Sequence, residues 1–163
     1  MPSKILYHVT LPENVESIKK SGLEAPGGCG RYREAGQPDP ESVYLSKLPT
    51  KKKPQAANIP SWMLGRDVVY VKVRIDEDDM DKILADDDWM IVHFVEKGDM
   101  SWEDWDDMPL EDKDDLSEDY WEESLRSGFG VRYHGDIPAS QIMGYIPAHV
   151  DCQGNVSFLS TKR

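Results

Sequence analysis

The stretch Val68-Val69-Tyr70-Val71-Lys72-Val73-Arg74-Ile75 is the strongest β-strand signal in this chain of 163 residues. Most of its residues are β-branched or aromatic, which are the residue types enriched in strands. Their alternation places Val69, Val71 and Val73 on one face of the strand. A short helix through Trp62–Leu64 is expected just before it. The stretch therefore predicts one long strand of a β-sheet.

Shorter patterns on both sides of this strand predict further elements. Upstream, the pattern predicts a strand at 5–10, a helix at 12–23 and a short strand at 43–46. Downstream, it predicts a helix at 116–125 with Ser117 as its cap, then strands at 131–134, 143–146 and 156–159. This order predicts an α+β fold with a split, mostly antiparallel sheet and flanking helices. We expect a single domain over residues 1–163.

Acidic residues are concentrated in the middle of the chain. The formal net charge is −12, yet residues 76–123 hold 22 Asp and Glu against three Lys, a net charge of −19, and the remainder carries +7. We interpret 76–123 as an acidic insertion, within which Trp89–Val95 is expected to form a strand. Such a segment is usually a solvated surface. Two other roles stay open, namely binding of a basic protein partner and covering of the protein's own basic cleft.

The composition disfavours several classes of protein. No stretch reaches the ~20 consecutive apolar residues of a membrane helix, and the first residues lack the apolar core of a signal peptide. We therefore expect a cytoplasmic protein with no membrane partner. Cys29 and Cys152 are far apart and belong to no Cys/His cluster, so we expect neither a disulfide nor a metal site.

Three pairs of polar residues lie on the expected strands. Because alternate residues of a strand point to the same side, the two members of each pair share a face. Each pair can line a cleft, although a structural or solvent-facing role is the commoner one for such residues when a pair is taken alone. The pairs are His8 with Thr10, Tyr44 with Ser46, and Arg132 with His134.

Taken together and in order, these segments resemble the ADP-ribosyltransferase superfamily. The matching segments are Tyr7-His8-Val9-Thr10, Ser21-Gly22-Leu23, Val43-Tyr44-Leu45-Ser46, Val68-Val69-Tyr70-Val71-Lys72-Val73 and Ile137-Pro138-Ala139-Ser140-Gln141-Ile142. They are spread over most of the chain outside residues 76–123. Two branches are the most similar, the DNA-targeting toxin-like ADP-ribosyltransferases and the tRNA 2′-phosphotransferases.

The resemblance implies a cleft between two small sheets that binds NAD. His8 would contact a ribose hydroxyl, the Val9 backbone the nicotinamide carboxamide, and Thr10 the nicotinamide ribose. Tyr44 would stack on the nicotinamide ring. Since cleavage of the nicotinamide–ribose bond produces an oxocarbenium-like ribose, the protein must orient the dinucleotide and stabilise positive charge. The implied NAD-binding set is His8, Val9, Thr10, Tyr44, Ser46 and Arg31.

The family's catalytic Glu has no counterpart at its usual place. In toxin-type enzymes it stands at the start of the strand before the "IP…I" segment, and this position falls at about Gly130. Glu122, Glu123 and Asp136 are the nearby carboxylates, and Glu123 is our candidate replacement. The phosphotransferase branch uses basic residues instead, which Arg31, Arg33, Arg66, Arg132 and His134 can supply. The candidate catalytic residues are His8, Tyr44, Arg132, His134 and Glu123.

The sequence therefore predicts an enzyme, an NAD-binding transferase that moves ADP-ribose onto a macromolecular acceptor, either a protein or a nucleic acid. Two alternatives stay open. One is an NAD-dependent RNA 2′-phosphotransferase, and the other is a non-catalytic binding or inhibitor protein that retains the fold. The missing carboxylate at Gly130 favours these alternatives.

Overall fold

Two antiparallel sheets organise the part of the chain that the computed structural model describes, residues 3–25, 41–56 and 59–159. The first sheet has the strand order β1-β3-β6-β7, and the second has the order β2-β5-β4. All of these neighbouring strands run antiparallel. In chain order the strands are β1 Lys4–Thr10, β2 Ser42–Leu45, β3 Asp67–Ile75, β4 Ile83–Ala85, β5 Val131–His134, β6 Ile142–Val150 and β7 Val156–Phe158.

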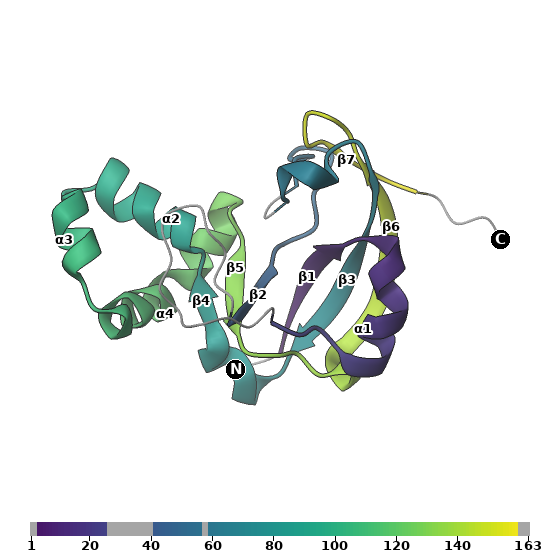
Figure 1. Cartoon of the computed structure of the whole chain (residues 1–163), viewed down its shortest axis with the longest axis horizontal. Coiled ribbons are helices and arrows are strands. Elements are labelled where there is room, and N and C mark those ends of the chain that lie inside the picture. The colour runs from purple at the N-terminus through teal and green to yellow at the C-terminus, as the bar shows by residue number, and fades with distance from the viewer. Residues whose placement is uncertain (1–2, 26–40, 57–58, 160–163) are drawn as a thin grey trace.

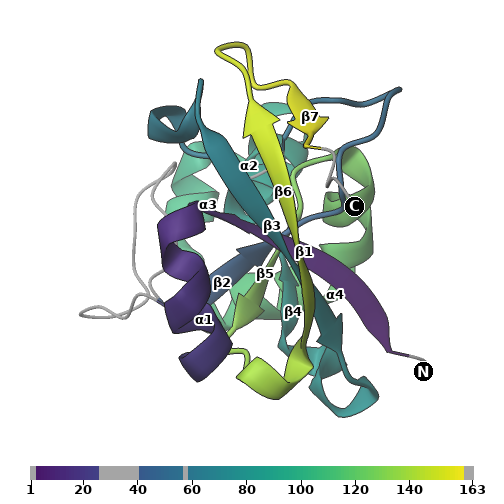
Figure 2. The same ribbon diagram turned by 90° about the vertical axis from the view of Figure 1, so that its right-hand side faces the viewer.

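Helices flank both sheets (Figures 1 and 2). α1 lies beside the first sheet, whereas α2, α3 and α4 gather on the side of the second sheet that faces away from the first. The helices are α1 Val15–Ser21, α2 Asp87–Ile91, α3 Trp102–Asp107 and α4 Leu110–Ser127. The short turns are η1 Pro12–Asn14, η2 Ser61–Met63, η3 Glu77–Lys82, the π-helical η4 Val92–Glu96 and η5 Ala139–Gln141. The predicted α+β fold with a split antiparallel sheet and flanking helices is confirmed.

The first sheet is buried on both of its faces. One face packs against the second sheet, and the other is covered by a second apolar cluster in which Val68 and Tyr70 contact Val9 and Met63. The predicted alternation of Val69, Val71 and Val73 therefore describes only one of two buried faces of β3. The first core includes Leu6, Val71, Val73 and Ile75 from the first sheet and Val43, Leu45, Ile83, Val131 and Tyr133 from the second.

A backbone bridge joins the two sheets. Tyr7 of β1 and Ser46, which follows β2, exchange N–H to carbonyl bonds of 2.9 and 2.8 Å. Gly22 ends α1 nearby with a φ of 78°, where a side chain would meet the Ile137 carbonyl oxygen at 2.1 Å. Glycine is therefore required at this close approach of α1 to the segment before β6.

The run Trp89–Val95 is helical, so the expected strand there is wrong. The Asp86 side chain accepts hydrogen bonds from the backbone N–H groups of Asp88 and Trp89 and thereby caps α2. Apolar residues in a short run can belong to a buried helix or a strand, and this cap selects the helix. The run packs into a third core with Trp105.

Two other helix predictions need correction. α4 begins at Leu110 rather than at residue 116, so Ser117 lies inside the helix and is not its cap. It ends at Ser127, two residues beyond the predicted end, and Gly128 is its C-cap with φ 95°. The helix expected through Trp62–Leu64 is a single 3₁₀ turn.

The acidic segment 76–123 is part of the fold rather than a solvated insertion beside it. It supplies β4, which pairs with β5, and α4 packs against β4. Residues 86–127, which hold α2, α3 and α4, are called the helical lobe below; they contain 17 Asp and Glu against three Lys and Arg. Within the described residues, no helix combines the length and the apolar character needed to cross a membrane.

Candidate functional site

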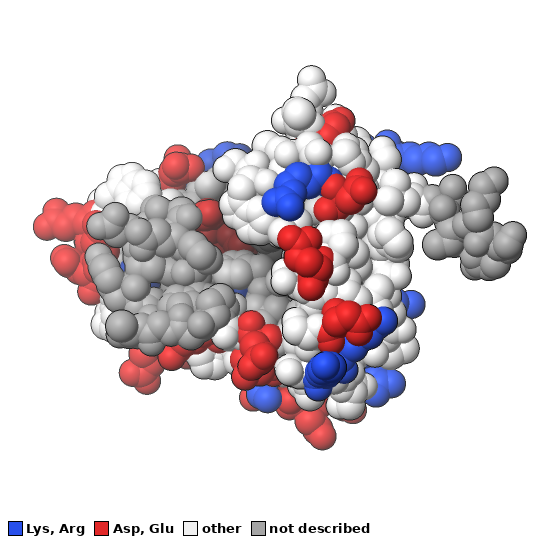
Figure 3. Space-filling view, turned by 45° about the vertical axis from the view of Figure 1, so that its right-hand side comes forward, with Lys and Arg blue, Asp and Glu red and all other residues white. Residues whose placement is uncertain are grey.

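A cleft of about 830 Å³ lies between the first sheet and the helical lobe. Its volume is within the range of ligand and cofactor sites. Figure 3 shows the surface hollowed between the two parts of the molecule. The lining comprises His8, Val9, Thr10 and Asn14 around β1, Tyr44 of β2, Ala56, Ile59, Pro60, Trp62 and Met63 before β3, and Asp86, Asp87, Asp88, Ser127, Gly128 and Phe129 of the lobe.

His8 and Tyr44 are joined directly. The His8 Nδ1 lies 2.9 Å from the Tyr44 carbonyl oxygen. Since a carbonyl oxygen only accepts hydrogen bonds, Nδ1 carries the hydrogen, and the neutral ring presents Nε2 as an acceptor. Burial lowers the pKa of His8, and the bond to Tyr44 opposes this effect in part. His8 is therefore neutral at pH 7 and can accept a hydrogen bond from a ligand hydroxyl.

Thr10 lies on the same face of β1 as His8. Its Oγ1 accepts a hydrogen bond of 3.0 Å from the Asn14 Nδ2, so its own hydroxyl hydrogen can be donated elsewhere. Val9, between them, also borders the cleft. Ser46 is buried at the bridge to Tyr7 and is not part of the described lining. Of the three predicted pairs, the first lines the cleft with both His8 and Thr10, and the second lines it with Tyr44 alone.

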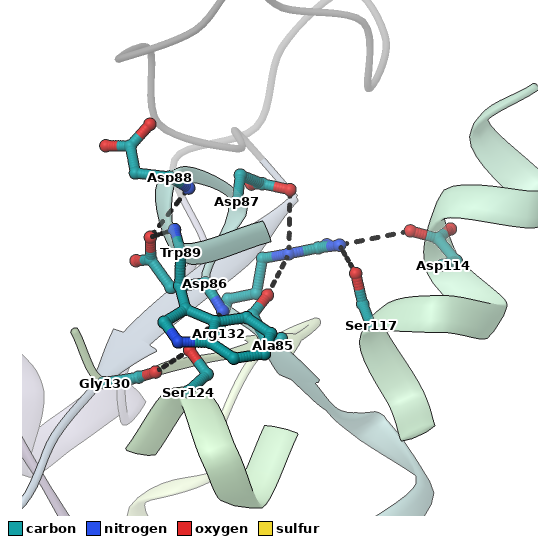
Figure 4. Close-up of polar contacts among 10 residues, drawn as sticks. All are labelled: Ala85, Asp86, Asp87, Asp88, Trp89, Asp114, Ser117, Ser124, Gly130 and Arg132. Carbon is teal, nitrogen blue, oxygen red and sulfur yellow. Dashed lines mark hydrogen bonds and ion pairs between the residues drawn. The ribbon is translucent and has the colours of Figure 1, made fainter. Parts of the chain in front are cut away.

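Carboxylates form the wall that the helical lobe contributes. Asp86, Asp87 and Asp88 follow β4 and open α2 (Figure 4). Asp86 is buried, with 6% of its surface exposed, whereas Asp88 is exposed. Burial and the neighbouring Asp88 raise the pKa of Asp86 to about 6, although its two backbone hydrogen bonds oppose the shift. Asp86 is therefore ionised at neutral pH in a poorly solvated position.

Asp86 stands across the strand pair from Gly130. Ala85 pairs with Val131 at the end of β4, and the next residues outward are Asp86 and Gly130. The Ser124 hydroxyl links them, because it accepts from the Asp86 N–H at 3.0 Å and donates to the Gly130 carbonyl at 2.6 Å. A carboxylate is therefore present beside the position where the sequence lacks one, but it comes from the neighbouring strand.

Arg132 is buried behind this wall. Only 1% of its surface is exposed, and its Nε lies 3.2 Å from the Ala85 carbonyl and 3.4 Å from Asp87 Oδ1. Its terminal NH2 group donates to Asp114 Oδ1 at 3.2 Å and to Ser117 Oγ at 3.3 Å (Figure 4). Arg132 thereby ties the start of α2 to α4, and it does not line the cleft.

The other predicted site residues lie elsewhere. Glu123 is exposed on α4, and His134 is exposed at the end of β5. Neither belongs to the described lining, to which this part of the chain contributes Ser127, Gly128 and Phe129 at the end of α4 and just after it. Arg66 is exposed and lies 4.0 Å from Glu13. Arg31 and Arg33 are outside the residues that the structure describes.

Sequence reasoning missed several lining residues, above all Asp86 and Trp62. The run Asp86-Asp87-Asp88 before apolar residues is a helix-start signal, which would have placed a capping carboxylate at Asp86. Trp62 gave no signal, since a lone aromatic residue beside a turn fits many roles. Among the described residues, no group of three or more His, Cys, Asp or Glu is arranged to hold a metal ion.

Comparisons with family models, with curated proteins and with solved structures found no match to this chain.

Proposed function

We propose that the protein binds NAD in this cleft and transfers ADP-ribose to a macromolecular acceptor. The observation that carries the proposal is the position of Asp86 beside Gly130, facing the same cleft as His8, Thr10 and Tyr44. This arrangement supplies a hydroxyl acceptor, a hydroxyl donor, an aromatic ring and a carboxylate around one space. These groups can contact a nicotinamide ring and its ribose.

Three of these groups, from Tyr44, His8 and Asp86, have a role in breaking the bond between nicotinamide and ribose. Tyr44 stacks on the nicotinamide ring, and the His8 Nε2 accepts a hydrogen bond from a ribose hydroxyl. The bonding electron pair leaves with neutral nicotinamide, and the Asp86 carboxylate stabilises the positive charge on the ribose. The acceptor nucleophile then bonds to the ribose C1′, and its proton passes to Asp86, whose raised pKa makes it a stronger base than an ordinary Asp.

The 2′-phosphotransferase alternative has less support. That chemistry needs basic residues around an RNA 2′-phosphate in addition to the diphosphate of NAD, and the described lining contains no Lys or Arg. Arg132 is occupied by Asp87 and Asp114, and His134 lies outside the lining. The proposal therefore stays with transfer of ADP-ribose.

NAD should raise the melting temperature of the protein. At a concentration 100-fold above its Kd, a ligand adds about 2.7 kcal/mol to stability, which corresponds to roughly 5 to 10 °C for a chain of this size. His8→Ala and Tyr44→Ala should remove the shift. His134→Ala is the matched control and should keep it, because His134 lies outside the described lining. Differential scanning fluorimetry measures all four proteins, and an unshifted wild type at millimolar NAD would refute the proposal.

The charge of the helical lobe favours a basic protein as acceptor over a nucleic acid. Of its 17 acidic residues, 14 are exposed, and Asp88 is both exposed and part of the cleft wall. A phosphate backbone approaching this wall would be repelled, whereas Lys and Arg side chains would be attracted. Acidic side chains also gather over the outer side of the lobe in Figure 3.

A nona-arginine peptide should bind the protein with a salt-dependent affinity. Glu103→Lys with Asp107→Lys, both exposed in α3, should weaken binding by about tenfold or more at low ionic strength. Glu16→Lys with Glu24→Lys makes the same charge change outside the lobe and should have a much smaller effect. Fluorescence anisotropy gives the affinities. Equal losses in both variants, or tighter binding of single-stranded DNA than of the peptide, would contradict a basic acceptor.

A further inference from the structure

One oxygen of the buried Asp86 carboxylate receives no hydrogen bond from the described residues. Asp86 is 6% exposed and lines the cleft. Both hydrogen bonds that its side chain accepts, from the backbone N–H groups of Asp88 and Trp89, end on Oδ1 (Figure 4). Oδ2 is therefore the oxygen left to face the cleft. Since a buried anionic oxygen without a donor is unfavourable, Asp86 favours a ligand that brings both N–H donors and positive charge.

The other polar groups of the cleft also favour a cation. The charge of Asp88, together with burial, raises the pKa of Asp86, so a cation at Oδ2 would oppose both effects. From the first sheet, His8 offers Nε2 as a further acceptor, because its Nδ1 is bound to the Tyr44 carbonyl. The part of the lining that the structure describes includes no basic side chain to pair with Asp86.

Aromatic side chains border the same cleft. Phe129 precedes Gly130, which stands across from Asp86 at the end of the β4–β5 pair, so Phe129 and Asp86 belong to one wall. Tyr44 and Trp62 add further aromatic surface. A planar guanidinium stacks on aromatic rings and bonds to carboxylates through a rigid fork of donors, whereas an ammonium is a strongly hydrated point charge. A carboxylate next to an aromatic ring therefore favours Arg over Lys.

The charge around the cleft favours an Arg within a protein chain over free arginine. The helical lobe carries 14 exposed acidic residues, one of which, Asp88, lies on the cleft wall. Free arginine has a carboxylate of its own, which these residues would repel. An Arg inside a peptide has no such group, and basic neighbours in the same chain would be attracted to the lobe.

We propose that the cleft binds the side chain of an Arg residue from a protein partner, with its guanidinium paired with Asp86 Oδ2 beside Phe129. This inference goes beyond the proposed function, because it concerns a ligand other than NAD and requires no NAD. It also differs from a general attraction of basic chains to the lobe, since it depends on one carboxylate.

The probe is the peptide acetyl-Gly-Gly-Arg-Gly-Gly-amide, whose Kd is measured by NMR titration of the ¹⁵N-labelled protein. Peptides with citrulline or Lys in place of Arg should bind at least about tenfold and about threefold more weakly, because citrulline lacks the charge and Lys lacks the planar fork. Asp86→Asn should raise the Kd of the Arg peptide by about tenfold or more, and Asn still caps α2. Asp119→Asn removes the same charge from an exposed position of the lobe outside the described lining, and should leave the Kd within about twofold.

A second variant tests the aromatic contact. Phe129→Leu keeps an apolar side chain and should raise the Kd of the Arg peptide by about threefold to tenfold. Phe158→Leu, on β7 and outside the described lining, is its control and should have no effect.

Several results would overturn the inference, and none of them depends on NAD because none is added. They are a wild type that fails to bind the Arg peptide at millimolar concentration, equal affinities for the Arg and citrulline peptides, and tighter binding of the Lys peptide. An unchanged Kd in Asp86→Asn would also overturn it. Equal losses in Asp86→Asn and Asp119→Asn would reduce the binding to a general attraction by the lobe and refute the site.

Discussion

Arg132→Ala should lower the free energy of unfolding by about 3 to 5 kcal/mol, the usual cost of removing one partner from a buried ion pair. The guanidinium is 1% exposed and lies among the Ala85 carbonyl, Asp87, Asp114 and Ser117. Its removal leaves two carboxylates without their shared cation and a carbonyl without its donor. Urea unfolding followed by circular dichroism measures the loss.

Two variants distinguish the buried network from a simple loss of positive charge. Arg66→Ala removes an exposed Arg that lies 4.0 Å from Glu13, and it should cost less than about 1 kcal/mol. Arg132→Lys keeps the charge but not the planar fork, so its stability should fall between those of Arg132→Ala and the wild type. If Arg132→Ala lowers the free energy of unfolding no more than Arg66→Ala does, the buried network around Arg132 contributes little to stability and the prediction is wrong.

Asp86→Asn should slow the cleavage of NAD by about a hundredfold to a thousandfold, the usual cost of removing a group that stabilises transition-state charge. Release of nicotinamide measures this step with water as acceptor, so no macromolecular substrate is needed. Asn caps helices as well as Asp does, so α2 should keep its start. Asp119→Asn, an exposed change on α4, is the control and should leave the rate unchanged. An unaltered rate in Asp86→Asn would contradict the role proposed for Asp86.

The same substitution should stabilise the protein at neutral pH. The pKa of Asp86 is about 6 in the folded protein against an ordinary value of 3.8. Between these two pH values the folded state retains a proton that the unfolded state has lost, so the free energy of unfolding falls as pH rises from about 4 to about 6. The cost above pH 6 is on the order of 3 kcal/mol. Asp86→Asn should abolish this pH dependence and recover the lost stability. Asp119→Asn should behave as the wild type in both respects.

Local patterns predicted four strands closely, because a strand's alternation and its bounding residues are adjacent in sequence, whereas the three-residue β4 was missed and β6 was predicted too short. β1, β2, β3 and β5 all lie within a residue of their predicted ranges. The strand expected at Trp89–Val95 was wrong for a tertiary reason. Its apolar residues are buried in the lobe's own core, so they show neither helical nor strand periodicity clearly.

The site could be predicted only where it depends on one strand. Alternation along β1 was enough to place His8 and Thr10 on one face, and both line the cleft. Asp86 could not be found in this way, because it reaches the cleft through the pairing of β4 with β5. Arg132 was misassigned for a similar reason. The pattern of β5 places it on a face, but the packing of α4 decides that this face is buried.

The position of β4 gives the surrounding acidic residues another consequence, which concerns solubility. β4 is one of the two edge strands of the second sheet, and its three residues, Ile83, Leu84 and Ala85, are buried and apolar. Such an edge can recruit a strand from another chain and start aggregation. The exposed Asp81 and Lys82 precede β4, so an added strand would meet charged side chains at that end. We expect these charges to act as gatekeepers against growth of the sheet between molecules.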